Sequence, residues 1–290
     1  MYWRTPDVSQ VTAERTFFDT KHKCFYGFVR SSFGKKYSDL NEHAVRYYQT
    51  KNKKYFGQII TYLNFLGLLQ LKLSEEKYWI VDKNNLLEAI NRKIEQGKYR
   101  FAKDYINYFL VHWQFPAPNI KENRHDPISK PFLIILKTLI LLHQKSPGEG
   151  YFSYHDFYKY FNEPTIVSPD EITDDLITNI IDDRARRAPV EIKDLKRKTG
   201  YYKALLKESY LITDNSSDYP DVTDFMIGLV LKEKLLNFGK YMIEEYKTEY
   251  FDFNRDVSST DKGIINEWAI YVNDKEKFIK WRKSLVEYLK

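Results

Sequence analysis

The chain has 290 residues, of which 43% are apolar and 30% charged, and it carries a net charge of +6 at pH 7. A chain of this length and hydrophobicity can bury two or three cores, which excludes a disordered or fibrous protein. The single cysteine, Cys24, excludes an internal disulfide and a cysteine metal cluster, so a reducing cytoplasm is expected. The longest apolar run, residues 132–142, is too short to span a bilayer, so no membrane partner is expected.

Positive charge is concentrated at the start of the chain, where residues 1–56 contain eleven Lys or Arg and five Asp or Glu. Such clustering is typical of a surface that binds nucleic acid, although a solvated face is the alternative. The chain also has 24 Tyr, whose ring and hydroxyl suit a wet polar interface. We therefore expect some tyrosines to face a ligand.

Two helices and a hairpin are predicted in succession within residues 35–82. Ser38 is expected to cap the first helix, and the second runs from Thr50 to its stop at Gly67. Alternating residues on either side of the turn SEEK predict the hairpin. Helix, helix, hairpin is the order of a winged helix, whose second helix would enter the major groove of DNA.

The first turn of the second helix is polar and rich in lysine. Lysine at a helix N-terminus opposes the helix dipole, so several of them indicate a phosphate partner, with a solvated helix start as the alternative. Asn can pair with adenine and Lys with guanine, so we expect this turn to read bases. The base-reading residues would be Lys51, Asn52, Lys53 and Lys54, and the other contacts in this unit would be Arg4, Lys35, Lys36, Arg46, Thr50 and Tyr55.

A second unit is predicted after a helical connection over residues 85–110 and a loop with three prolines over residues 109–127. It starts with a buried helix, residues 131–145, and a helix that Ser153 caps, with Asp156 completing a capping box. Residues 193–213 predict a further helix pair with a basic, Tyr-rich start. The DNA contacts expected here are Tyr154, His155, Arg187, Lys196, Arg197, Lys198, Tyr201 and Tyr202.

From Val222 on, the pattern is read as helices that form a connector. Their aromatic residues, spaced as on a buried helix face, indicate core packing. None of the six histidines forms an HxxxH or HxH pair, and no GxSxG or nucleotide-binding glycine loop is present. We therefore expect no metal, no nucleotide and no catalytic residue in this chain.

The stretch SPDEITDDLITNIIDDRARRAPVEIK contains the PD and ExK elements of a Mg²⁺-dependent nuclease. Its candidate residues are Asp170, Glu191 and Lys193. A metal ligand of this kind should lie on or beside a strand, whereas the apolar residues after Asp170 have helical spacing. Ser168 and the residues after it read as the capping box of that helix, and catalysis by this motif is kept only as an alternative.

Several segments resemble the recognition region of type IIS restriction endonucleases of the AlwI and BpuJI kind. The most specific are YFLVHWQFPAP and PFLIILKTLILL, and FSYHDFYKYF, PDEITDDLITNIIDDRAR and KKYFGQIITYLNFLGLLQLKLSEEKYWIVDK are also similar to it. The likeness covers residues 50–210. It implies two winged-helix subdomains that clamp a short asymmetric duplex, with the PD-ExK cleavage site in a separate downstream domain.

The expected fold is mainly α with small β-hairpins, in the α+β class, with two winged-helix subdomains and a helical connector. Residues 1–110 would form an N-terminal arm and the first subdomain, residues 111–221 the second, and residues 222–290 the connector. The expected function is sequence-specific binding of double-stranded DNA by a monomer, as the recognition domain of a restriction endonuclease in the bacterial cytoplasm. Mg²⁺ would be needed only by a C-terminal or separate nuclease domain. A stand-alone winged-helix transcription regulator is the other alternative.

Overall fold

The computed structural model describes residues 12–21, 23–49, 53–118, 125–161, 166–187, 192–258 and 260–290. The fold is mainly helical with two small antiparallel sheets, which confirms the predicted α+β class. The first part of the chain forms α1 (Ala13–Phe17), α2 (Phe25–Ser31), the 3-10 turn η1 (Tyr37–Asp39), α3 (Leu40–Tyr48), α4 (Lys53–Phe65), β1 (Leu71–Leu73), β2 (Trp79–Val81), α5 (Asn85–Glu95) and α6 (Arg100–His112).

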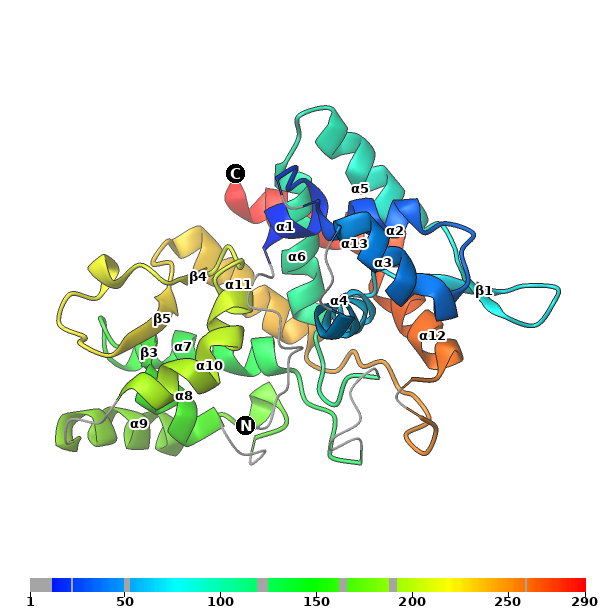
Figure 1. Ribbon diagram of the computed structural model, residues 1–290. Coiled ribbons are helices and arrows are strands. Elements are labelled where there is room, and N and C mark those ends of the chain that lie inside the picture. The colour runs from blue at the N-terminus through cyan, green and yellow to red at the C-terminus, as the bar shows by residue number, and fades with distance from the viewer. Residues whose placement is uncertain are drawn as a thin grey trace.

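The second part begins with α7 (Pro131–Lys145). It continues with β3 (Tyr151–Ser153), α8 (Tyr154–Phe161), η2 (Pro169–Glu171), α9 (Asp174–Arg186), α10 (Ile192–Leu206), β4 (Ile212–Thr213), η3 (Ser216–Asp218), β5 (Phe225–Leu229) and α11 (Glu233–Tyr246). The chain ends with α12 (Lys262–Val272) and α13 (Lys275–Leu289). Figure 1 shows two lobes, with α1 to α6 and α12 in one and α7 to α11 in the other.

The first sheet is the predicted hairpin extended by a third segment. Strands β1 and β2 are antiparallel, with Leu71 opposite Val81. On the other side of β2, Lys36 forms a bridge to Ile80, and the Val81 N–H donates to the Lys35 carbonyl at 3.0 Å. The strand that comes last in the chain therefore lies in the middle.

The second sheet has the same arrangement. Its order is β3, β5, β4, and both outer strands are antiparallel to β5. All five residues of β5 are buried. Residues 222–232 were predicted as part of a helix, so this prediction is wrong here. A continuous apolar run fits a strand with both faces covered as well as it fits a buried helix.

Three helix boundaries also differ from the predictions. Helix α3 is preceded by η1, so its N-cap is Asp39 and not Ser38. Ser168 accepts from the Asp170 N–H as predicted, but it caps only the short η2, and α9 begins after Thr173, whose hydroxyl accepts from the Leu176 N–H. Residues 193–213 form one helix and strand β4, not a helix pair.

Two local signals are confirmed. Gly67 ends the α4 segment with φ +66°, and an added Cβ would lie 2.2 Å from the Val272 side chain of α12. The Ser153 hydroxyl accepts from the Asp156 N–H, and the Asp156 carboxylate accepts from the Ser153 N–H, both at 3.0 Å. Both signals act within a few residues, which is why the sequence could predict them.

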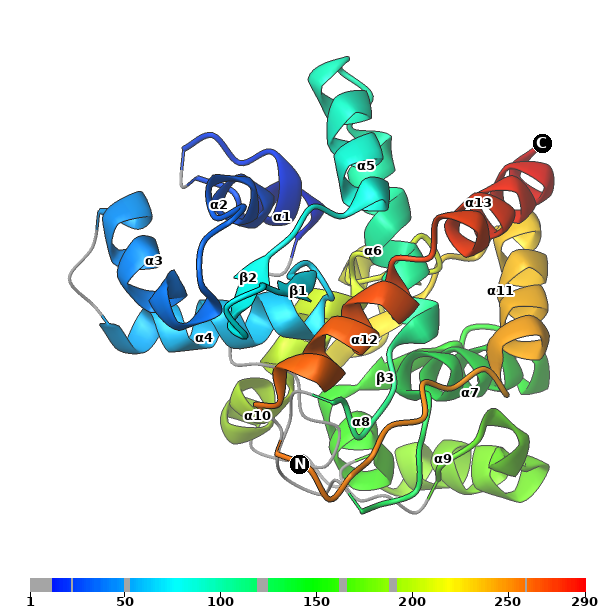
Figure 2. The same ribbon diagram turned by 90° about the vertical axis from the view of Figure 1, so that its right-hand side faces the viewer.

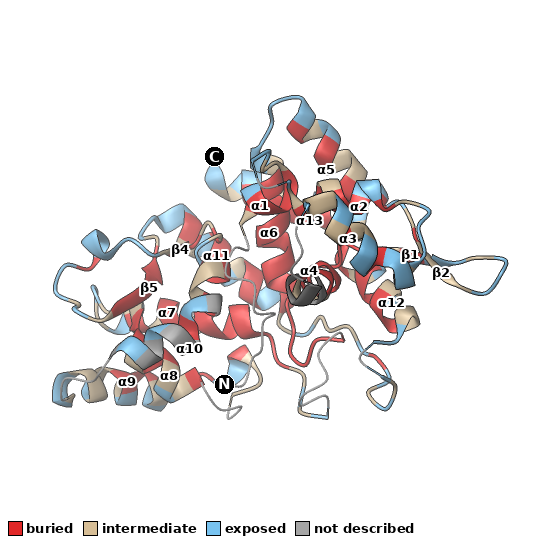
Figure 3. Ribbon diagram, in the orientation of Figure 1, coloured by how far each residue is buried: buried red, intermediate tan, exposed pale blue. Residues whose placement is uncertain are grey.

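The core is centred on α6 and α7, which are buried along most of their length (Figure 3). Helix α7 is apolar on nearly all sides because the second lobe surrounds it. No helix in the described ranges has a stretch that is long and apolar enough to cross a membrane.

Helix α12 is integral to the first lobe, whereas α13 packs against both α6 and α11. The Asn266 side chain of α12 accepts from the Leu71 N–H at 2.8 Å, and the Trp268 indole donates to the Phe65 carbonyl at 2.9 Å. Asn273, which is buried, donates to the Gly67 carbonyl and accepts from the Tyr105 hydroxyl. As predicted, the aromatic residues Trp268, Phe278 and Trp281 belong to the core.

The lobes meet at a group of ionisable side chains around the buried Lys130. Lys130 precedes α7, is fully buried and donates to the Val111 carbonyl at 3.1 Å. Burial lowers the pKa of Lys130 to about 7, and the opposing attraction of Glu249 is insufficient to restore it. Glu249 itself pairs with Lys277 and lies 3.6 Å from the His112 imidazole.

We predict that Asn273→Ala lowers the free energy of unfolding by about 2 kcal/mol, because the Gly67 carbonyl loses a buried donor. Urea unfolding followed by circular dichroism measures this change. Glu267→Ala, at an exposed position of the same helix, is the control and should have little effect. Equal stability of the two variants would contradict the structural role of Asn273.

We further predict that stability rises with pH above neutrality through Lys130. Between pH 7 and pH 10.5 the folded protein holds a neutral amine and the unfolded chain a charged one, so unfolding becomes less favourable as pH rises. The contribution is up to about 1.4 kcal/mol per pH unit. Lys130→Met should remove this rise, as measured by urea unfolding of both proteins at several pH values from 7 to 9. Parallel profiles would contradict the prediction.

Candidate nucleic-acid interface

The first group of candidate contacts lies where the chain enters the first sheet. Lys35 and Lys36 are exposed, and neither has a carboxylate partner among the described residues. The Lys36 ammonium lies 4.0 Å from the centroid of the Tyr78 ring, which belongs to the loop between β1 and β2. The sheet therefore presents two uncompensated cations next to its hairpin.

Arg46 adds a third cation on α3. It pairs with Glu42 one turn earlier at 3.3 Å, but the two side chains are 68% and 75% exposed. An ion pair in such solvent is worth less than about 1 kcal/mol. A phosphate could therefore replace Glu42 as the partner of Arg46 at little cost.

Several predicted contacts cannot be placed. Arg4, Thr50, Lys51 and Asn52 lie outside the described residues. For six other predicted contacts on α4 and α10, the structure describes the backbone but not the side chains. These residues are Lys53, Lys54, Tyr55, Arg197, Lys198 and Tyr201. The base-reading turn at the start of α4 therefore stays a prediction.

The second group of candidate contacts is on α10. Lys193 and Lys196 are exposed, and Lys203 is half-buried. The ammonium groups of Lys196 and Lys203 lie 5.5 and 5.7 Å from the centroid of the Tyr154 ring, and Lys203 donates to the Tyr154 hydroxyl at 3.4 Å. Of the residues predicted in this unit, Tyr154 and Lys196 are thus brought together.

The side chain of Asp156 organises the start of this surface. It is fully buried, and one carboxylate oxygen accepts from the Arg184 Nε at 2.9 Å while the other pairs with Arg187. Arg184 also donates to the Glu149 and Tyr151 carbonyls. These contacts join β3 and α8 to the end of α9, which is separated from the start of α10 by five residues.

Arg187 was predicted to meet DNA, but it is oriented into this network. Besides Asp156, it pairs with Asp183 at 3.4 Å and with Asp224 at 3.6 Å, and its side chain is only 14% exposed. Burial lowers the pKa of the Arg187 guanidinium, but these carboxylates outweigh burial and raise it above its usual value. The neighbouring Arg186 is 81% exposed and is the better placed of the two for a phosphate.

Two other predicted contacts are also partly or fully enclosed. The Tyr202 ring is buried in the core beside Phe157 and Trp113. His155 is half-buried, and burial together with the charge of Arg187 lowers the pKa of its imidazole, so it is neutral at pH 7. Tyr202 therefore has a core position, and His155 offers no charge to phosphate.

His155, Asp156 and Asp183 also place one ligand atom each within 4.8 Å of one another. Both oxygens of Asp156 are occupied by guanidinium groups. One oxygen of Asp183 accepts from Lys159 at 2.7 Å, which holds the pKa of Asp183 below its usual value. Since cations already neutralise both carboxylates, the group does not fit a metal ion.

The candidate nuclease residues are not placed as a nuclease core requires. Asp170 lies on η2, is exposed and pairs with Lys247 at 2.9 Å. Lys193 lies on α10, and Glu191 is outside the described residues. Neither of the two placed residues is on a strand.

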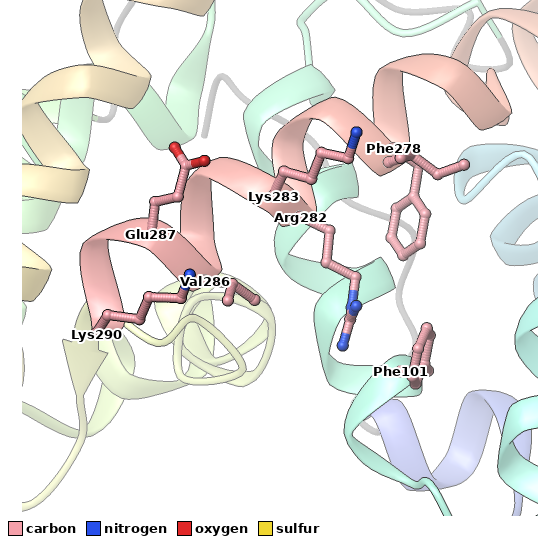
Figure 4. Close-up of a pocket in the computed structure, with 8 residues that line it drawn as sticks. Phe101, Phe278, Arg282, Lys283, Val286, Glu287 and Lys290 are labelled. Atoms are coloured by element: carbon pink, nitrogen blue, oxygen red, sulfur yellow. The ribbon is translucent and has the colours of Figure 1, made fainter.

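Helix α10 and one end of α4 lie toward the same side of the molecule. In Figure 2, the α3 end of α4 and α10 lie to the left, whereas α11 and α13 lie to the right. A surface pocket of about 360 Å³ between α6 and α13 is lined by Phe101, Phe278 and Arg282 among others (Figure 4). Arg282 pairs there with the buried Asp104 at 2.7 Å, and the pocket is not part of the α4 and α10 surface.

The Asp156 network is the feature that sequence reasoning missed. The capping-box pattern identified Asp156, and the basic end of the acidic helix identified the arginines. Nothing in the local pattern indicated that these two features meet. The contact joins residues about thirty positions apart, and only the packing of α8 against the end of α9 brings them together.

We predict that Arg187→Gln destabilises the protein by roughly 3 kcal/mol, because it leaves a buried carboxylate short of one cation. Arg186→Gln is the matched control on the adjacent residue and should change stability by less than about 0.5 kcal/mol. Thermal and urea unfolding of both variants would measure the difference. A similar stability for the two would show that Arg187 is not held by the network.

Comparisons with known proteins leave the family open. No family model matches the chain, and no curated protein or solved structure matches it. The likeness to type IIS recognition regions therefore stays an expectation from the sequence.

Proposed function

We propose that this chain binds double-stranded DNA in a sequence-specific manner through two winged-helix units. The observation that carries the proposal is a shared order of elements. In the first unit the order is α2, the Lys36 segment, α3, α4, β1, a loop and β2. In the second it is α7, β3, α8, α10, β4, a loop and β5, with α9 inserted before α10.

The sheets support the same assignment. In both units the strand after the loop lies between the other two and is antiparallel to them. Helix, strand, helix, helix, strand, wing and strand is the winged-helix plan, and its third helix is the one that enters the major groove. This plan makes α4 and α10 the two recognition helices.

Charge and orientation agree with that role. Lys35 and Lys36 are exposed in the outer sheet segment of the first unit, and Lys193 and Lys196 are exposed on α10. Cations of this kind position a duplex through its phosphates, and base edges are read by the side chains that reach into the groove. Because α4 and α10 are presented on one side (Figure 2), one monomer could contact a single asymmetric site with both helices.

The resemblance found in the sequence extends the proposal. It would make this chain the target-recognition region of a type IIS restriction endonuclease, with cleavage and its Mg²⁺ assigned to a separate nuclease domain. A stand-alone winged-helix regulator is the alternative, and such proteins normally dimerise on a palindrome. The symmetry of the selected DNA site therefore separates these two functions.

We predict that selection from a random duplex library yields one short asymmetric site bound by a monomer. Lys35→Ala should weaken binding to the selected site and to other sequences alike, since it removes a phosphate contact. It should also lower the slope of log affinity against log salt concentration (the salt slope) by about one. Asn52→Ala should instead relax the preference at one base pair. Gel-shift titrations at several salt concentrations measure both effects.

Lys240→Ala is the matched control, because Lys240 is exposed on α11, which lies on the opposite side from α4 and α10. It should leave affinity and salt slope unchanged. An equal loss on selected and random DNA for Asn52→Ala would contradict base reading by α4. A palindromic site bound by a dimer would favour the regulator, and no binding to duplex DNA would contradict the proposal.

A further inference from the structure

Gly200 lies in the middle of α10, and no described residue of the folded chain requires a glycine there. Glycine in the interior of a helix is destabilising relative to alanine. It is usually found where the backbone is left-handed or where another group approaches closely. Gly200 is helical and has no positive φ, and a Cβ added to it would meet nothing within 4 Å. The helix therefore keeps an unfavourable residue at an exposed position where the structure would accept a side chain.

The residues around Gly200 provide positive charge. Lys196 and Lys203 are four residues before it and three after it, so all three lie on one face of α10. Both ammonium groups are near the Tyr154 ring, and no carboxylate of a described residue lies within ion-pair distance of either. Because both ammonium groups lie close to the Tyr154 ring, they repel each other. A bound anion would reduce this repulsion.

Negative charge limits where a duplex can approach this unit. The loop between β4 and β5 has exposed aspartates at positions 214, 218 and 221 and no lysine or arginine. Lys207, which directly follows α10, has its ammonium group 4.0 Å from the carboxylate of Asp214. The loop would repel phosphate, so a duplex is expected to approach this surface along α10, where Lys196 and Lys203 have no carboxylate partner among the described residues.

We propose that Gly200 is the point at which α10 approaches the sugar-phosphate backbone of duplex DNA most closely, with Lys196 and Lys203 on the phosphates to either side. The missing side chain lets the helix backbone and the duplex come together, a use of glycine seen where a chain must approach a ligand closely. This inference rests on the proposed function. It assigns the second unit to positioning the duplex and leaves the reading of bases mainly to α4.

The test is Gly200→Ala in the full chain, with a fluorescein-labelled duplex of random sequence at low salt as the probe. The added methyl group should weaken binding by about tenfold, or about 1.4 kcal/mol, and should raise the Tm by about 1–2 °C because alanine favours the helix. Weaker binding by a more stable protein cannot come from unfolding. Lys196→Ala and Lys203→Ala should each weaken binding and lower the salt slope by about one, whereas Lys240→Ala should do neither.

The outcomes separate this inference from the function on which it rests. Wild-type protein that binds no duplex would overturn both. Wild-type binding that Gly200→Ala leaves unchanged would overturn only the close approach at Gly200. If Lys196→Ala loses no more DNA affinity than Lys240→Ala, the proposed phosphate contact of Lys196 is contradicted, while the proposed function stands.

Discussion

The buried carboxylate of Asp156 is the interaction on which the second lobe depends. A buried charge is tolerated only when it is paired and hydrogen-bonded, and Asp156 meets this condition with Arg184, Arg187 and the Ser153 N–H. Through Arg187 the network also reaches Asp224, just before β5. Asp156 thus joins β3 and α8 to the end of α9, and Arg187 extends the network to the residue before β5. Arg187 is the last described residue before α10, which begins at Ile192.

The other end of α10 is held by the first lobe. Asn107 of α6 donates to the Glu208 carbonyl and accepts from the Tyr210 N–H, and Asp104 accepts from the Tyr210 hydroxyl. The buried Asp104 also pairs with Arg282 of α13. A helix proposed to lie against DNA is therefore followed directly by residues that bind buried polar groups of the other lobe. This arrangement would set the position of α10 relative to α4, which two helices on one duplex require.

The two proposed winged helices use the same plan with different chemistry. In the first unit, Lys35 and Lys36 lie in the outer segment of the sheet that bridges to β2, and the turn assigned to base reading follows at the start of α4. In the second, the loop after β4 is acidic, and exposed positive charge includes Arg186 at the end of α9 and the lysines of α10 around Gly200. A fold common to both units does not dictate a common mode of contact, because the contact depends on which exposed positions carry charge. The difference supports a division between reading bases and positioning the duplex.

Features that depend on neighbouring residues could be predicted from the sequence alone. The Ser153 and Asp156 capping box, the stop at Gly67, the hairpin around SEEK and the buried helix α7 all follow from patterns a few residues long. Tertiary structure decided the rest. Residues 225–229 form a strand because β3 and β4 flank them, and β3 is more than seventy positions away in the chain. Arg186 and Arg187 are adjacent and chemically identical, yet only packing against α8 directs one to solvent and the other to Asp156. A local sequence pattern predicts hydrogen bonds between residues that are close in the chain. The partner of a buried charge depends instead on which distant segments pack together in the core.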